Sequence, residues 1–232
     1  MDASTADAKA RLTDAVGREI VATVMLETTL KGLDSDKNAA VLVPLFDSNG
    51  SIRVLLTKRS QFVSSHKGEI CFPGGRVEAS DRDDVDTALR ETEEEIGLAR
   101  EHVEIVTHLP SILSRNLVCV RPIVGIIPRD ARLSVDPREV ESAFSMPLAE
   151  FLNARIARSR TILWRGQRVL MPFFDYRDSE TNQVHTVYGL TGWICLAVAV
   201  CVYRKMPEFD LDPPGENEIR QRLKSLLASS QL

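Results

Sequence analysis

The amino-acid sequence predicts an α/β protein with a mixed β-sheet, and three observations lead to that class. Segments of β type stand before, between and after a few helical segments, without the regular alternation of a doubly wound parallel sheet. The apolar stretch 40–46 is followed by the turn signal Asp47-Ser48-Asn49-Gly50 and a second apolar stretch, 52–57, which together predict a hairpin. Between residues 81 and 97, apolar side chains recur at helical spacing.

The elements after the hairpin follow from similar signals. A polar, basic loop at 58–68 leads to the short apolar segment 69–72 and to a turn at Pro73-Gly74-Gly75. The first long helix takes Asp81 or Asp83 as its N-cap and ends at Gly97. We predict further strands at 103–107, 120–127, 162–164 and 169–174, and further helices at 187–203 and 216–228.

The composition is that of an ordinary globular protein, with 232 residues, 44% of them hydrophobic and 27% charged. A net charge of −4 gives no reason to expect binding to a nucleic acid polymer or an anionic membrane. The uncharged stretch 187–203 is at the short edge of membrane-spanning length, and a buried core helix is the favoured interpretation. The four cysteines show no C-x-x-C spacing and are expected to be reduced and mostly buried.

The two ends of the chain are less informative. Residues 1–38 are polar, with short helical patches, and are expected to form a lead-in segment before one domain at 39–232 with a C-terminal helix. An apolar signal-peptide core is missing, and early aspartates argue against a mitochondrial transit peptide, so we expect an intracellular, cytoplasmic protein. Ser230-Gln231-Leu232 loosely resembles the peroxisomal address S-K-L, for which chance is the favoured explanation.

Glutamates crowd the C-terminal half of the first long helix. On a helix, Glu91 and Glu95 share a face, Glu94 flanks it and Glu93 points elsewhere. Like charges one turn apart weaken a helix by roughly 0.2–0.5 kcal/mol per pair, so a bound cation would explain why they are tolerated. Carboxylate oxygens in this number suit Mg²⁺ or Mn²⁺, and Arg90 can fix the rotamer of one glutamate.

A solvated acidic face is the simpler explanation for an isolated run of glutamates. The context favours a site, because the Gly74-Gly75 turn lies upstream and the Gly97-Leu98 pair closes the segment. Glycines let the backbone approach a ligand closely and offer amide or carbonyl groups to a phosphate or a metal.

The segment resembles the Nudix box, G-x5-E-x7-R-E-U-x-E-E-x-G-U, in which U is apolar. Arg90-Glu91, Glu94-Glu95 and Gly97-Leu98 match in register, whereas Thr92 stands where an apolar residue is usual. In addition, Gly75 lies one residue further from Arg90 than the pattern asks, and Asp81 replaces the early glutamate.

These last two departures resemble the coenzyme A (CoA) diphosphatase branch, which carries F-P-G-G, a longer loop, an aspartate and A-L-R-E. An upstream signature of that branch, L-L-T-x-[TR]-[SA]-x3-R-x3-G-x3-F-P-G-G, is also similar to this chain. It matches at Leu55–Ser60, Gly68 and Phe72–Gly75, but Ser64 replaces the middle arginine. An ordinary basic loop is the alternative for the cations of this region. The substrate-binding residues that the resemblance implies are Lys58, Arg59, His66, Lys67 and Gly74.

The resemblance implies a Nudix α/β/α sandwich with a mixed β-sheet and a hydrolase that uses Mg²⁺ or Mn²⁺. In the CoA branch, the diphosphate of CoA or acyl-CoA is cleaved to 3′,5′-ADP and 4′-phosphopantetheine or its acyl derivative. Two alternatives stay open: another small nucleotide substrate, such as ADP-ribose, NADH or a nucleoside triphosphate, or a non-catalytic nucleotide-binding module. The presence of Arg90, Glu91, Glu94 and Glu95 argues against the second alternative. Either a monomer or a homodimer is compatible with the sequence.

The resemblance also implies roles for single residues. Arg90 is an orienting partner of the glutamates. Glu91 and Glu95 are the principal metal ligands, and Glu94 is a further ligand or base. The Gly75 carbonyl is an additional candidate ligand, and Asp81 is expected to stabilise the loop. The general base stays open among Glu91, Glu94, Glu139 and Glu141.

Overall fold

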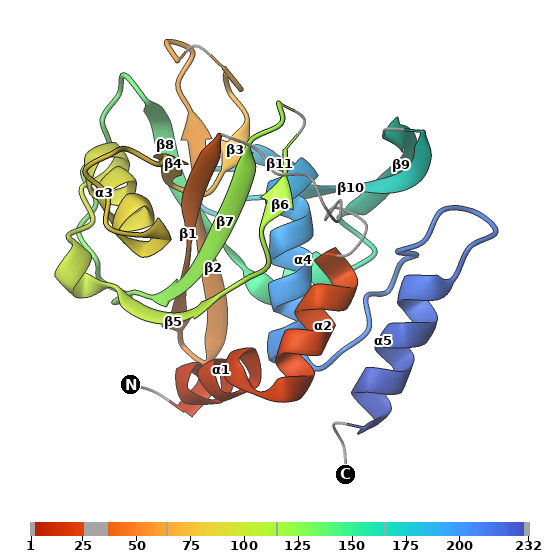
Figure 1. Ribbon diagram of the computed structural model, residues 1–232. Helices are drawn as coiled ribbons and strands as arrows, with labels where there is room; N and C mark the ends of the chain where they lie inside the picture. The colour runs from red at the N-terminus through yellow and green to blue at the C-terminus, as the bar shows by residue number, and fades with distance from the viewer. Residues whose placement is uncertain (1–2, 26–36, 64, 115, 165, 230–232) are drawn as a thin grey trace. The chain divides into compact units, whose positions relative to one another are not determined.

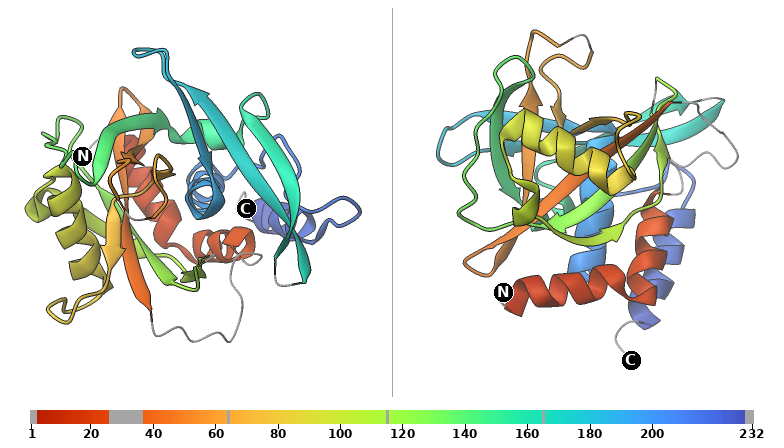
Figure 2. Two further views of the ribbon diagram at one scale, coloured as in Figure 1. Left: turned by 90° about the horizontal axis from the view of Figure 1, so that it is seen from above. Right: turned by 60° about the vertical axis from the view of Figure 1, so that its left-hand side comes forward.

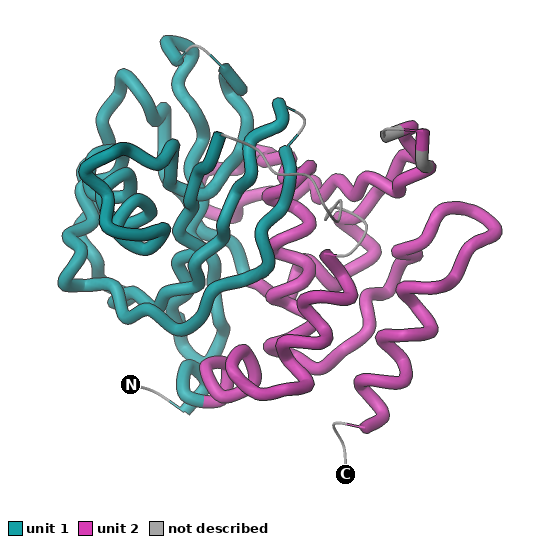
Figure 3. Tube along the Cα trace, in the orientation of Figure 1, with its two compact units in different colours: residues 1–6, 29–147 teal, residues 7–28, 148–232 magenta. Residues whose placement is uncertain are grey.

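The computed structural model describes residues 3–25, 37–63, 65–114, 116–164 and 166–229 (Figure 1). The chain divides into two compact units, which Figure 3 colours separately. Unit 1 comprises residues 1–6 and 29–147, and unit 2 comprises residues 7–28 and 148–232. The boundary near residue 38 stays a prediction, and the segment before it contains two helices, α1 (Ala3–Thr13) and α2 (Ala15–Met25).

Unit 1 is built on a mixed sheet around strand β1 (Asn38–Ser48). β1 pairs antiparallel with β2 (Ser51–Arg59) and parallel with β7 (Cys119–Ile126), so the predicted hairpin and mixed sheet are confirmed. The strand order is β3-β2-β1-β7-β5, with β4 beside β1, β6 beside β7 and β8 beside β2. The remaining strands are β3 (Ile70–Cys71), β4 (Gly74–Arg76), β5 (Glu104–His108), β6 (Ile112–Leu113) and β8 (Val140–Pro147).

Helix α3 (Asp84–Ile96) begins and ends where its sequence provides caps. The Asp83 side chain accepts a hydrogen bond from the Asp86 backbone N–H at 2.8 Å, which makes it the N-cap. Gly97 adopts a left-handed conformation with φ 66° and donates its N–H to the Glu93 carbonyl. The short 3₁₀ helix η1 (Arg100–His102) follows.

One face of α3 packs on the sheet, against β1, β4 and β7 (Figure 2). Ala88 and Ile96 join Leu42 of β1 and Ile123 of β7 in a common buried core. Burying one large aliphatic side chain stabilises a fold by about 1.5–3 kcal/mol. That gain exceeds the repulsion between the glutamates, roughly 0.2–0.5 kcal/mol per pair, so the core holds the acidic face in place.

Unit 2 combines helices with a three-stranded antiparallel sheet. Helix α4 (Gly189–Tyr203) contacts α2, the 3₁₀ helix η2 (Leu148–Leu152) and two of the strands. Its residues 191–202 are all buried, which confirms the predicted core helix. Of the helices in the described part of the chain, none has the length and apolar character needed to span a membrane. The other elements are β9 (Ala157–Trp164), β10 (Gln167–Arg177), β11 (Val184–Tyr188) and α5 (Glu218–Ser229).

The structure confirms the α/β class and differs from the sequence-based expectations in detail. Gly74 and Gly75, expected in a turn, belong to strand β4, because Gly74 with φ 150° lets two backbones approach each other. Val187 and Tyr188, expected in a helix, end β11; Tyr188 is extended, and the helix starts at Gly189. Strand β8 was not predicted, because its segment mixes small, polar and apolar residues.

Candidate active site

The double glycine brings strand β4 against both β1 and the acidic face of α3. A Cβ atom at Gly74 would lie 2.4 Å from the Ala40 carbonyl oxygen. A Cβ atom at Gly75 would lie 2.2 Å from Cδ and 2.3 Å from Oε1 of Glu91. The position of Gly74 therefore needs glycine, because its Cβ atom would meet backbone at a positive φ, whereas a Cβ atom at Gly75 would displace the Glu91 carboxylate. The Gly75 backbone forms a wall directly beside that carboxylate.

Glu95 is the most buried glutamate of α3, with a side chain that is 2% exposed. Its Oε2 accepts a hydrogen bond from the Gly74 N–H at 3.2 Å, and its Oε1 lies 3.3 Å from Arg59 Nη1. Burial raises the pKa of Glu95 to about 7, against the lowering effect of Arg59 and of the Gly74 N–H. The charges of Glu91 and Glu139 raise the pKa further, so a cation placed here would stabilise the ionised form.

Glu91 lies on the same face, with a side chain that is 16% exposed, and accepts a hydrogen bond from Arg90 Nη1 at 3.0 Å. Burial raises the pKa of Glu91, Arg90 lowers it, and the charge of Glu94 raises it. Glu94 is 56% exposed and accepts from the same Arg90 nitrogen at 3.2 Å. Arg90 thus contacts two of the three carboxylates predicted to bind metal, and its orienting role stays a prediction.

Asp81 holds Arg90 from the other side. This nearly buried carboxylate accepts hydrogen bonds from Arg90 Nε at 2.8 Å and Nη2 at 3.0 Å. It also accepts from the Thr87 hydroxyl and the Glu78 N–H, which ties the loop together. The hydrogen bonds from Arg90 hold the pKa of Asp81 well below its usual range. A two-point grip of this kind fixes the guanidinium plane, so Asp81 links the longer loop to the rotamer of Arg90.

Two residues of the box stand apart from this network. Glu93 faces Arg100, whose Nε lies 3.6 Å from Glu93 Oε2, so it is separate from the acidic face as predicted. Thr92 is buried where the family pattern has an apolar residue, and its hydroxyl donates to the Ala88 carbonyl at 2.6 Å. That local bond satisfies the hydroxyl within its own helix.

The segment before β8 is anchored next to the acidic face. The Asp136 N–H donates to the Glu95 carbonyl at 2.9 Å, and the Ser60 N–H donates to the Glu139 carbonyl at 2.8 Å. The charge of Glu139 raises the pKa of Glu95, which puts its carboxylate within electrostatic range of the site. By contrast, Glu141 pairs with Lys58, with 2.5 Å between Nζ and Oε1.

The other predicted substrate contacts lie on the loop after β2. His66 bridges two partners, with Nδ1 2.8 Å from Glu69 Oε2 and Nε2 3.1 Å from Asn116 Nδ2. Lys67 is exposed. Ser64, which replaces the arginine of the upstream signature, lies outside the described residues. In contrast to Arg59 and Gly74, which both contact Glu95, His66 is held by partners away from the α3 glutamates.

Comparison with known proteins identifies the family. The NUDIX domain matches residues 36–165, which is more than half of the chain. The chain belongs to the NUDIX domain family. "Nudix hydrolase 15, mitochondrial" of Arabidopsis thaliana is 38% identical over 200 residues, covering 82% of this chain and 70% of that protein.

Two further relatives carry more specific names. "Peroxisomal coenzyme A diphosphatase NUDT7" of Mus musculus is 35% identical over 178 residues, covering 77% of this chain and 75% of that protein. "Peroxisomal coenzyme A diphosphatase ndx-8" of Caenorhabditis elegans is 32% identical over 179 residues, covering 76% of this chain and 73% of that protein. The protein is therefore a Nudix hydrolase, and the predicted enzyme class is confirmed.

The donor chemistry of this Nudix hydrolase fits a divalent cation. Glu91 and Glu95 present hard carboxylate oxygens on one face. Burial raises the pKa of each, the arginines lower it, and neighbouring carboxylates raise it further. Within the described residues, no group of three or more acidic, histidine or cysteine side chains is already arranged around a metal position. Arg90 and Arg59 instead bind the carboxylates, so metal binding has to displace or share these contacts.

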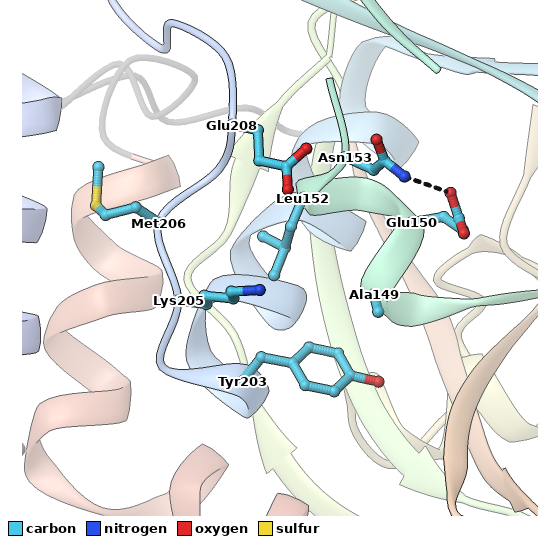
Figure 4. Close-up of a pocket in the computed structure, with 8 residues that line it drawn as sticks. All are labelled: Ala149, Glu150, Leu152, Asn153, Tyr203, Lys205, Met206 and Glu208. Carbon is cyan, nitrogen blue, oxygen red and sulfur yellow. Dashed lines mark hydrogen bonds between the residues drawn. The ribbon is translucent and has the colours of Figure 1, made fainter. Parts of the chain in front are cut away.

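A cavity of about 250 Å³ lies in unit 2 (Figure 4). Figure 4 shows the Asn153 amide donating to the Glu150 carboxylate, at 3.3 Å. None of the residues predicted to act in catalysis or metal binding lines it, so the cavity is not part of the candidate active site. The lining residues are Ala149, Glu150, Leu152, Asn153, Tyr203, Lys205, Met206 and Glu208.

Proposed function

We propose that this Nudix hydrolase cleaves the diphosphate of CoA or acyl-CoA to 3′,5′-ADP and 4′-phosphopantetheine or its acyl derivative. One observation carries the proposal: the two halves of the CoA signature meet at one carboxylate. Arg59, from L-L-T-K-R-S, and Gly74, from F-P-G-G, both contact Glu95. The names of the mouse and nematode relatives, at 35% and 32% identity, support the same substrate.

The proposed cofactor is Mg²⁺ or Mn²⁺, held by Glu91 and Glu95 with Glu94 and the Gly75 carbonyl as further ligands. When bound, such a cation neutralises diphosphate oxygens and lowers the pKa of an attacking water. The chain itself supplies the geometry: Asp81 fixes Arg90, and Arg90 in turn holds Glu91 and Glu94.

In the reaction, a water oxygen forms a new bond to phosphorus and the bridging P–O bond breaks. One proton leaves the water, and the departing phosphate keeps the bridging oxygen. We propose Glu139 as the base that takes the proton, because Arg90 already occupies Glu91 and Glu94 and Lys58 occupies Glu141. Its backbone is fixed beside Ser60, at the end of β2.

The proposed partner is a small nucleotide derivative, bound by a monomer or a homodimer. Other nucleotide substrates, including ADP-ribose and NADH, are the second candidate function, because the box glutamates serve the whole family. Of the three relatives described above, one is named mitochondrial and two peroxisomal, so their names do not agree on a compartment. The cytoplasmic location and the weak peroxisomal address stay predictions, and Ser230-Gln231-Leu232 lies outside the described residues.

A substrate panel tests the proposal. The purified chain is incubated with Mg²⁺ or Mn²⁺ and CoA, acetyl-CoA, ADP-ribose or NADH, and the products are separated by chromatography. We expect 3′,5′-ADP from CoA and acetyl-CoA, at higher kcat/KM than AMP from the other two substrates. Turnover of ADP-ribose or NADH far above CoA would overturn the substrate, and no turnover of any diphosphate would overturn the activity.

A further inference from the structure

Strand β2 ends in an irregularity that separates two neighbouring cations. Its pairing with β8 shifts register between Lys58 and Arg59, and such bulges commonly redirect a side chain next to a site. Lys58 pairs with Glu141, whereas Arg59 reaches Glu95. Both backbone groups of Arg59 bond to one neighbouring segment: its N–H donates to the Glu69 carbonyl at 3.0 Å, and its carbonyl accepts from the Gly68 N–H at 3.1 Å.

The Arg59 side chain is largely enclosed, with 21% of its surface exposed. Its Nε is buried and has no hydrogen-bond partner in the described part of the chain. A substrate phosphate cannot reach this nitrogen in the observed arrangement. The guanidinium has two side-chain partners, Glu95 and the Cys71 thiol; burial raises the pKa of that thiol, and its hydrogen bond with Arg59 lowers it.

The Glu95 carboxylate is held at both oxygens by donors from different elements. Arg59, from the end of β2, lies at Oε1, and the Gly74 N–H, from β4, donates to Oε2. Two such contacts define the plane of the carboxylate as well as its position. No other glutamate of α3 has an arginine from outside the box and a backbone N–H among the partners described for it.

We propose that Arg59 is a positioning residue, which fixes the Glu95 carboxylate and does not contact the substrate. This inference rests on the proposed function, because it assigns a role within the same site. It gives the L-L-T-K-R-S part of the upstream signature a different role: Arg59 serves the acidic face, and recognition of the CoA phosphates falls to other residues. Arginine is suited to this task by its planar guanidinium, which lysine cannot reproduce.

A double-mutant cycle on stability tests the pair without any activity measurement. Arg59→Gln, Glu95→Gln and the double variant are unfolded thermally at pH 8 in the presence of a chelator. Arg59→Gln leaves a buried carboxylate without its partner, so we expect its Tm to fall by several degrees and the double variant to recover most of that loss. Strictly additive shifts would overturn the proposed pair. Arg59→Lys takes the place of Arg59→Gln in the cycle if the latter does not fold.

Kinetics with CoA and dephospho-CoA distinguish positioning from substrate contact. We expect Arg59→Gln to lower kcat by about tenfold or more, with KM for both substrates within about twofold of wild type. Arg59→Lys should recover part of kcat. A raised KM for CoA alone, with unchanged kcat, would show that Arg59 grips the 3′-phosphate and would overturn the proposal.

The matched control is Arg53→Gln on the same strand. Arg53 donates to the Ser145 hydroxyl at 2.9 Å and to the Ser145 carbonyl at 2.6 Å, so its loss weakens the β2–β8 pairing without touching Glu95. We expect a lower Tm with wild-type kcat and KM. If the wild-type enzyme hydrolyses no diphosphate, the proposed function fails, and the stability cycle alone decides the role of Arg59.

Discussion

Helices α3 and α4 differ in the kind of side chain that they bury. α4 is buried throughout residues 191–202, and its sequence contains no charged residue. α3 places Ala88 and Ile96 in the core but also buries Glu95, a carboxylate whose pKa is raised by that burial. The difference is consistent with an α4 that serves packing and an α3 that gives up some stability to hold charge where we propose that a cation binds.

A charge placed in α4 should have the largest effect, because nothing there compensates it. Val198 is fully buried, and Val198→Asp is expected to destabilise the fold by about 4 kcal/mol or more, enough to unfold unit 2. Urea unfolding followed by circular dichroism measures this. The matched control is Val184→Asp at a position that is 51% exposed, where we expect a change of about 1 kcal/mol or less. Equal losses in the free energy of unfolding for the two variants would contradict the view that a buried charge in α4 is uncompensated.

Removing the charge of Glu95 from α3 should strongly lower activity while the fold remains. Glu95→Gln is nearly the same size and is expected to lower kcat by roughly 10²–10³-fold, because a ligand of the proposed cation is lost. Initial rates with saturating CoA and Mg²⁺ measure the effect. Glu93→Gln is the control, since Glu93 faces Arg100 away from the acidic face, and near-normal activity is expected. Near-normal activity of Glu95→Gln would remove Glu95 from the site.

The same substitution should stabilise the metal-free protein at high pH. The pKa of Glu95 rises from 4.5 to about 7 on folding, so its contribution to stability is full below pH 4.5 and is lost as pH rises through 7. Glu95→Gln cannot ionise and escapes this loss. With chelator present, its advantage over wild type should grow over that window to about 3 kcal/mol at most. Parallel stability curves for the two proteins would contradict a raised pKa at Glu95.

Gly75→Ala tests the close approach between β4 and α3. The new Cβ would overlap the Glu91 carboxylate, 2.2 Å from its Cδ, so Glu91 has to move. We expect kcat to fall by about tenfold with only a small change in Tm. Gly192→Ala in α4 is the control, because its nearest contact would be an ordinary 3.4 Å to Phe174 Cε2. An unchanged kcat for Gly75→Ala would show that the wall beside Glu91 has no catalytic importance.

The smallest effect is expected at the position where the box departs from its pattern. Thr92→Val removes a hydroxyl that bonds only within its own helix, so the free energy of unfolding should change by about 1 kcal/mol or less. Chemical denaturation measures it, with activity expected near wild type. A loss of more than about 2 kcal/mol would show that the hydroxyl has a role beyond its local bond.

The contrast also shows what could be predicted from sequence. α3 and its acidic face were predictable because caps, helical spacing and carboxylate register are all local: Asp83, Gly97 and the Glu91–Glu95 run lie within fifteen residues of each other. α4 was equally clear from its composition. The extended path of Gly74 was not, because it depends on a close approach to β1 that no neighbouring residue signals.

Long-range contacts of the site were beyond sequence reasoning for the same reason. Arg59 was named by a signature, but its contact with Glu95 depends on a register shift between β2 and β8. The position of Glu139 depends on hydrogen bonds to the end of β2. Asp81 was expected to stabilise its loop, whereas its two-point grip on Arg90 became visible only in three dimensions.

The central claim is that the acidic face of α3 binds a divalent cation, and Mn²⁺ binding tests it directly. Free Mn²⁺ is titrated by electron paramagnetic resonance against wild type, Glu95→Gln and Glu93→Gln, without substrate. The account predicts saturable binding to wild type and Glu93→Gln, and at least about tenfold weaker binding to Glu95→Gln. Equal affinity of all three proteins would contradict the assignment of the metal site to α3.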